Sequence, residues 1–164
     1  MKIAVVDIEN AKDKKLKVEF NDFIEEVPTE SPIKAEFVFE DLRQTIRAVG
    51  KISADMILQC NRCLEEFVLE ADVDVDECFY KTELFSEHKN EREVKFDAIG
   101  QDLNGADEID VKDLIYQSLI LYVPNDCVCD INCNGDESVN KYLTQKSIDP
   151  RLEIFKNIKI EKDK

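Results

Sequence analysis

The sequence predicts a single α+β domain over residues 1–164, with an antiparallel, barrel-like sheet, one main helix packed on it and a short C-terminal helix. Three observations predict this fold. Apolar and polar residues alternate along much of the first 80 residues, which is typical of strands with one buried face. A Cys-x-x-Cys knuckle divides the two longest alternating stretches, and an amphipathic stretch follows Asp110. A chain of 164 residues is long enough to bury one core.

The first two predicted strands cover residues 15–20 and 33–39, where apolar residues occupy every second position. Pro28 and Pro32 lie in the loop between them, since proline removes a donor from a strand ladder.

Residues 43–59 and 66–80 are predicted to form a long hairpin. Even positions are apolar before the knuckle and odd positions after it, as expected if Asn61-Arg62 is a tight reversal. Both thiols of the knuckle then lie on the apolar side. Gly50 interrupts the first strand and predicts a bulge or bend.

The outward face of residues 66–80 carries four carboxylates. Hard cations are usually wrapped by oxygens from a loop, so a solvated acidic face is the favoured interpretation and a cation site the weaker one. The four residues are Glu70, Asp72, Asp74 and Asp76.

Two helices and one strand are predicted in the second half. Residues 94–99 are read as a short strand between loops. Asp110 can cap a helix that ends at Pro124, with apolar residues at three- and four-residue spacing. Pro150 suits the first position of the final helix, which runs to about residue 158.

The charge balance points to a basic protein partner. The net charge is −15, from 37 acidic and 22 basic side chains, which argues against a broad nucleic-acid-binding face. Lysines at residues 12–15 and at the C-terminal end could still touch RNA, or form solvated termini. No apolar run is long enough for a membrane span, and the first residues turn acidic too soon for a secretory signal, so we expect a cytoplasmic protein.

The cysteines predict either a structural zinc site or buried thiols, and the pattern leaves both open. Cys60 and Cys63 have the spacing of a zinc knuckle, and Cys129 and Cys133 are the expected second pair, with Cys127 able to replace either. Redox catalysis is disfavoured, because a redox Cys-x-x-Cys belongs at a helix start.

Four segments carry a further signal: 60–67, 110–124, 129–135 and 149–152. Together they resemble the YceD-like family, the large ribosomal RNA subunit accumulation proteins, over about residues 33–158. The resemblance implies a non-enzymatic role in producing or accumulating large-subunit ribosomal RNA. Many relatives carry further cysteines after the position of Gly135, and this chain has none there.

Partner contact is predicted at Arg62, Asp149 and Arg151, in segments that carry the resemblance. Arg62 lies at a tight turn, where a rigid guanidinium suits a phosphate or carboxylate, unless it pairs with a local acid. The expected partner is a ribosomal protein or pre-ribosomal particle, and no membrane or small-molecule substrate is expected. The alternatives are a zinc- or thiol-dependent enzyme and a purely structural interaction module, although no phosphate-binding loop, His-Glu zinc motif or nucleophile elbow is present.

Overall fold

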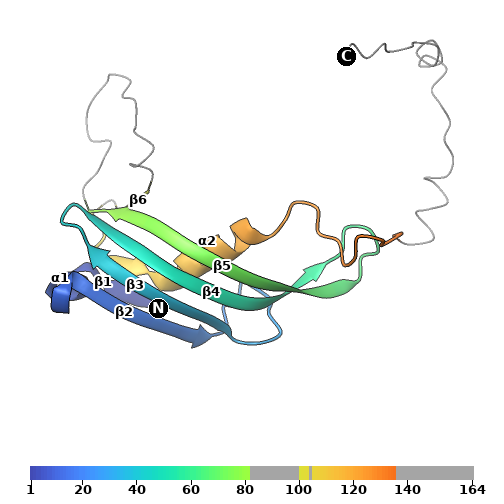
Figure 1. The fold of residues 1–164 in the computed structure, drawn as a ribbon, viewed down its shortest axis with the longest axis horizontal. Helices are drawn as coiled ribbons and strands as arrows, with labels where there is room; N and C mark the ends of the chain where they lie inside the picture. The colour runs from blue at the N-terminus through green and yellow to red at the C-terminus, as the bar shows by residue number, and fades with distance from the viewer. Residues whose placement is uncertain (82–99, 104, 136–164) are drawn as a thin grey trace, which may run out of the picture.

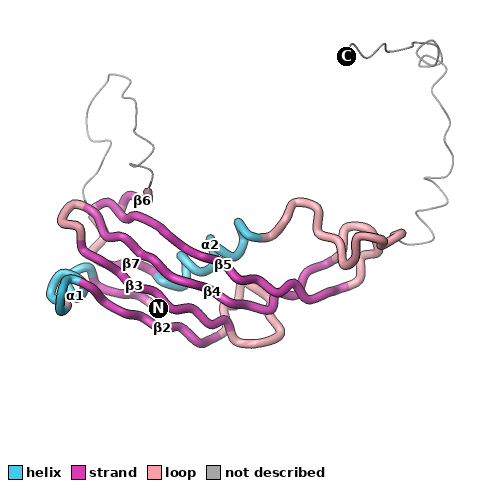
Figure 2. The backbone as a smooth tube through the Cα atoms, viewed as in Figure 1, coloured by secondary structure: helices cyan, strands magenta, loops and turns pink. Residues whose placement is uncertain are grey.

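An open five-stranded sheet dominates the computed structural model, which describes residues 1–81, 100–103 and 105–135 (Figure 1). The strand order is β2-β3-β4-β5-β6, and a separate two-stranded ribbon pairs β1 with β7. Figure 2 shows the strands side by side, with loops gathered at the far end of the longest hairpin. In chain order the elements are β1 (Lys2–Ala4), α1 (Val5–Asn10), a 3-10 turn (Lys12–Lys14), β2 (Lys15–Asp22), β3 (Ile33–Asp41), β4 (Thr45–Gln59), β5 (Glu66–Tyr80), β6 (Gln101–Asp102), β7 (Glu108–Asp110) and α2 (Val111–Tyr122).

The long hairpin is confirmed. β4 and β5 are each 15 residues long and pair antiparallel without a break from Thr45–Tyr80 to Gln59–Glu66. The strands predicted at 15–20 and 33–39 correspond to β2 and β3, which also pair antiparallel. Alternation located these strands because each buries one face only.

The predicted barrel was wrong. β2 lies at one side of the sheet and β6 at the other, and within the described residues no strand joins these edges. A barrel requires its first and last strands to pair, which alternation within one strand cannot reveal. The sheet is also not purely antiparallel, because the two residues of β6 pair parallel with Phe79 and Tyr80.

Gly50 does not form the predicted bulge. The register of β4 passes through it on both sides, pairing it with Phe37 and Val75. A Cβ atom there would lie 2.3 Å from the Phe37 ring and 2.4 Å from the Glu36 carbonyl oxygen. Glycine is therefore required because the Phe37 ring lies directly over this strand.

The helix predicted after Asp110 is α2, and it covers the inner face of the sheet. Asp110 caps it by accepting a hydrogen bond from the backbone N–H of Lys112 (3.0 Å). No helix among the described residues is long and apolar enough to span a membrane. The helix buries four apolar side chains in the core shared with the strands: Val111, Leu114, Ile115 and Leu119.

The outer face of β5 is acidic and solvent-exposed, as predicted. Two of its carboxylates pair with cations on β4: Arg47 Nε donates to Asp76 (2.7 Å), and Lys51 lies 3.0 Å from Asp72. Cross-strand pairs of this kind stabilise a sheet weakly and keep the face soluble.

The first ten residues form structure that the sequence analysis did not predict. β1 pairs with β7 through Ile3 and Ile109, and α1 buries Ile8. The strand predicted at 94–99 and the helix predicted from Pro150 lie outside the described residues.

Candidate metal centre

The tip of the β4–β5 hairpin is a six-residue loop, 60–65, and not the two-residue reversal that was predicted. Its ends are closed by a hydrogen bond from the Cys60 N–H to the Glu65 carbonyl (2.9 Å). Within it, the Leu64 N–H donates to the Cys60 carbonyl (3.0 Å), and Leu64 has a positive φ of 65°. This extra length lets the loop bend back, so that Cys60 and Cys63 can face the same point.

The second loop follows α2 and reaches the hairpin tip (Figure 1). The N–H of Asn61 donates to the Cys127 carbonyl (2.8 Å), which joins the two loops through their backbones. Asp130 turns the second loop by accepting from the N–H of Asn132 at its side chain (2.7 Å) and from the N–H of Cys133 at its carbonyl (3.0 Å). Asp favours such local turns because its short side chain reaches the backbone two residues on.

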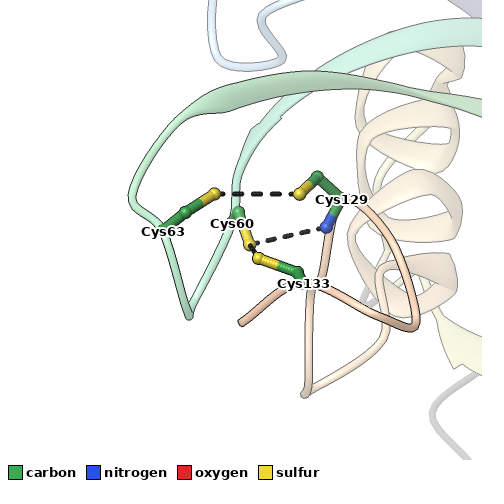
Figure 3. A group of neighbouring side chains, drawn as sticks. All are labelled: Cys60, Cys63, Cys129 and Cys133. Carbon is green, nitrogen blue, oxygen red and sulfur yellow. Dashed lines mark hydrogen bonds between the residues drawn. The ribbon is translucent and has the colours of Figure 1, made fainter. Parts of the chain in front are cut away.

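Four cysteines meet where the loops join. The Sγ atoms of Cys60, Cys63, Cys129 and Cys133 all lie within 4.8 Å of one another. Figure 3 shows the two hairpin cysteines facing the two cysteines of the second loop. The Cys60–Cys133 and Cys63–Cys129 sulfur distances are 3.8 and 3.7 Å.

These distances fit a tetrahedral zinc site. Four thiolates about 2.3 Å from one Zn²⁺ place neighbouring sulfurs about 3.8 Å apart. A disulfide would require about 2.05 Å, so the spacing does not correspond to oxidised pairs. All six cysteines are free thiols. The donor set is also chemically suitable, since soft thiolates select Zn²⁺ over hard cations.

Backbone N–H groups stabilise the buried sulfur. The N–H groups of Cys63 and Cys129, together with that of Arg62, lower the pKa of Cys60 to about 6. The Arg62 and Cys129 nitrogens each lie 3.4 Å from Cys60 Sγ. The neighbouring thiols have the opposite effect on Cys129 and raise its pKa to about 12. Four thiolates this close repel one another unless a cation lies between them, and a Zn²⁺ ion would supply that charge.

Arg62 holds the second loop against the hairpin tip through two hydrogen bonds. Its Nη1 donates to the carbonyls of Cys133 (3.1 Å) and Ile131 (3.3 Å). Neither partner is the local acid considered in the sequence analysis. Gly135, with φ of 74°, lies so close that a Cβ there would be 3.0 Å from the Arg62 carbonyl oxygen. These contacts hold the cysteine loop in place, and Arg62 itself remains exposed at the protein surface.

The two other cysteines take no part in the cluster. Cys127 is buried and its thiol donates to the Pro124 carbonyl (3.1 Å), so it does not replace Cys129 or Cys133. Cys78 lies on β5. Asp149 and Arg151 lie outside the described residues.

Sequence reasoning overlooked the residues that join the loops, Asn61, Asp130 and Gly135. The Asp-x-Asn spacing at 130–132 was a usable signal of an Asx turn.

Comparison with known proteins gives one match. The family model described as large ribosomal RNA subunit accumulation protein YceD matches residues 48–159. The matched region begins within β4 and therefore includes the hairpin tip, α2 and all four clustered cysteines, but not β2 or β3. No curated protein and no solved structure matches the chain.

Proposed function

Because the chain belongs to the YceD family of large ribosomal RNA subunit accumulation proteins, we propose that it supports the accumulation of large-subunit ribosomal RNA without being an enzyme. The family match carries this proposal, because it covers most of the chain. The protein would act in the cytoplasm, where a reducing environment keeps thiols free.

The proposed role of the cysteine cluster is structural. Cys60, Cys63, Cys129 and Cys133 would hold one Zn²⁺ with four protein ligands. A site closed by four protein ligands leaves no position for a water or a substrate, whereas catalytic zinc sites keep one open. Zinc would fix the second loop on the hairpin tip and present both as one rigid surface.

We expect that surface to contact a ribosomal protein or pre-ribosomal particle. Arg62 is the proposed partner-binding residue at the hairpin tip, because its guanidinium is exposed while Nη1 is held by the second loop. Asp149 and Arg151 are proposed to contribute to the same surface. The net charge of −15 supports a basic partner, since complementary charge speeds encounter and suppresses wrong partners.

The test is the ratio of large-subunit to small-subunit ribosomal RNA in cells that lack the protein. We expect that ratio to fall and wild-type protein to restore it. Arg62→Ala should restore it poorly, whereas Arg43→Ala should restore it fully. Arg43 is the matched control because it is an exposed arginine in the β3–β4 turn, at the opposite end of β4. An unchanged ratio in the deletion strain would contradict the proposed function.

A second measurement separates binding from enzymatic activity. Affinity capture from native lysate should recover a ribosomal protein or precursor particle with the wild-type protein and less with Arg62→Ala. Turnover that persists through purification and disappears in Cys63→Ser would instead support a thiol- or zinc-dependent enzyme.

A further inference from the structure

The free edge of β5 is the feature that the proposed function does not use. β4 pairs with β5 along its whole length on one side, while β6 covers only Phe79 and Tyr80 on the other. Gly100 closes the edge slightly further, because a Cβ there would lie 2.4 Å from the Cys78 carbonyl oxygen. In the part of the chain that the structure describes, the edge of residues 66–76 therefore has no strand beside it.

Hydrogen bonds at both ends of the hairpin identify the backbone groups on this edge. Lys81 donates its N–H to the Gln44 carbonyl, and the Glu65 carbonyl accepts from the N–H of Cys60. The backbone N–H and C=O groups of odd-numbered residues in β5 therefore point toward β4. The carbonyl of the even-numbered Tyr80 accepts from Leu103 on the opposite side. By this alternation, the N–H and C=O groups of residues 70, 72 and 74 point to the free edge.

A groove of mixed character runs beside this edge. Its volume is about 440 Å³, and it lies between β5 and the C-terminal end of α2. Val73 and Val75 line it from the strand, and Leu121 and Tyr122 line it from the helix; its polar lining residues are Asp74, Asp76, Glu77 and Ser118. Leu121 is 84% exposed, although it belongs to a helix whose other leucines, Leu114 and Leu119, are buried. An exposed leucine beside an open groove and an unpaired strand edge indicates a surface built for contact.

The outer face of the same edge is acidic. Glu70, Asp72, Asp74 and Asp76 alternate with the inward-facing residues, and Asp74 and Asp76 also border the groove. The only cations that pair with these four carboxylates in the described residues are Arg47 and Lys51. A strand added to this edge would place one set of alternate side chains against Val73, Val75 and Leu121 in the groove and the other set beside the outer carboxylates.

We propose that the free edge of β5 receives an extended segment of a partner protein, in which apolar residues alternate with lysine or arginine, as an added strand. Backbone hydrogen bonds to residues 70, 72 and 74 would provide affinity, and the groove and the carboxylates would select the sequence. This assignment rests on the proposed function for its biological partner, which it specifies as a basic protein with an extended segment.

The other long edge of the sheet does not have these properties. β2 begins at Lys15 and carries Lys17 on its exposed face, while Lys15 pairs with Glu40 (3.1 Å). Lysines on an edge strand discourage strand addition, and β2 lacks the row of four carboxylates that β5 carries. The sheet therefore presents one protected edge and one receptive edge.

The test uses the full chain and a synthetic heptapeptide of alternating valine and lysine, labelled for fluorescence anisotropy. We expect saturable binding that weakens as salt increases, and no binding of the matched valine–glutamate heptapeptide. Amide hydrogen exchange followed by NMR should show new protection at residues 70, 72 and 74 when the valine–lysine peptide binds. Binding without that protection, or no binding, would overturn the proposal.

Two variants test the two halves of the surface. Asp74→Lys should weaken peptide binding about fivefold at low salt, and Leu121→Ser should weaken it by a similar factor at all salt concentrations. Glu19→Lys makes the same charge change on the opposite edge, and Val6→Ser removes an exposed apolar side chain (54%) on α1, which contacts β2 and β3. Equal affinity in all four variants would overturn the assignment.

Other occupants give different results. If another segment of this chain covers the edge, amides 70, 72 and 74 are protected in the free monomer; if a second copy does, they are protected only in a dimer. Either result overturns the proposal.

Normal ribosomal RNA accumulation in a strain carrying Asp74→Lys and Leu121→Ser would reject the surface while leaving the proposed function in place. An unchanged ratio in the deletion strain would reject the function alone, because the peptide experiment does not depend on it.

Discussion

If Zn²⁺ joins the two cysteine loops as proposed, its loss should lower the free energy of unfolding by an amount that follows from the positions of the cysteines in the chain. Cys63 and Cys129 are 66 residues apart in sequence and 3.7 Å apart at their sulfurs. A cross-link that closes a loop of this length restricts the unfolded chain by about 4 kcal/mol at 25 °C. For a domain of this size, that loss corresponds to a fall in melting temperature of about 10 °C.

Cys129→Ser is the informative variant, because Cys129 is exposed and its replacement leaves the core intact. Cys60 is fully buried, so a serine there would also bury a hydroxyl group and confuse the result. Zinc content per chain should be measured by elemental mass spectrometry, and melting by circular dichroism with and without chelator. We expect about one zinc per wild-type chain and a chelator-sensitive melting temperature.

Cys78→Ser is the matched control, since it removes a thiol on β5 outside the cluster. It should retain zinc and melt like the wild type, while Cys129→Ser should lose zinc and no longer respond to chelator. Wild-type protein without zinc, melting at the same temperature with and without chelator, would show that the four thiols merely pack. Loss of free thiols in the isolated protein would show disulfides instead, and would refute the cross-link by metal.

Three further changes test the framework around the site. Gly50→Ala should destabilise the protein by about 3 kcal/mol, measured by urea unfolding, because its Cβ would clash with the Phe37 ring and a strand carbonyl. Hydrogen bonds from Lys81 and Lys14 lower the pKa of the buried Asp41 to about 2. The ionised Asp41 therefore contributes about 2 kcal/mol to the free energy of unfolding above pH 4, and this contribution is lost as the pH falls toward 2. Asp41→Asn should remove this part of the pH dependence of stability. Arg62→Ala should speed zinc transfer to a chromophoric chelator several-fold, since two contacts to the cysteine loop disappear.

Each of these has a control or a contrary result. Gly105→Ala should cost only about 1 kcal/mol, because its φ of 77° is strained for alanine, but among the described residues beyond its chain neighbours no atom lies within 4 Å of the new Cβ. An unfolding curve for Asp41→Asn that falls as steeply in acid as the wild type would assign the acid loss to other carboxylates. Arg43→Ala should release zinc at the wild-type rate, and equal rates for Arg62→Ala would mean that its contacts do not hold the loop.

Sequence alone predicted the hairpin because each of its strands buries one face along its length. A period of two persists from Ile46 to Leu58 and returns after the knuckle with the opposite parity, which fixes the pairing of β4 with β5. The helix after Asp110 was equally clear, because its cap and its apolar spacing agree.

The missing parts of the prediction depend on contacts that have no local pattern. β1 and β7 are three residues each and pair across about 100 residues of sequence, so neither has enough length for a period to appear. Whether the sheet closes depends on where its edge strands lie, and alternation within single strands does not reveal that.

The cysteine pair of the hairpin was found by its spacing, whereas the second pair is separated by three residues and matched no zinc motif. The turn made by Asp130 accounts for that spacing, because it folds residues 130–132 away and returns Cys133 to Cys60. The absence of cysteines after Gly135 weakened the zinc interpretation of the sequence, yet four thiols come together without them. The two residues inside the knuckle explain how: Asn61 binds the backbone at Cys127, and Arg62 binds it at Cys133. The Cys-Asn-Arg-Cys segment thus supplies two candidate ligands and also the contacts that bring the other two to them.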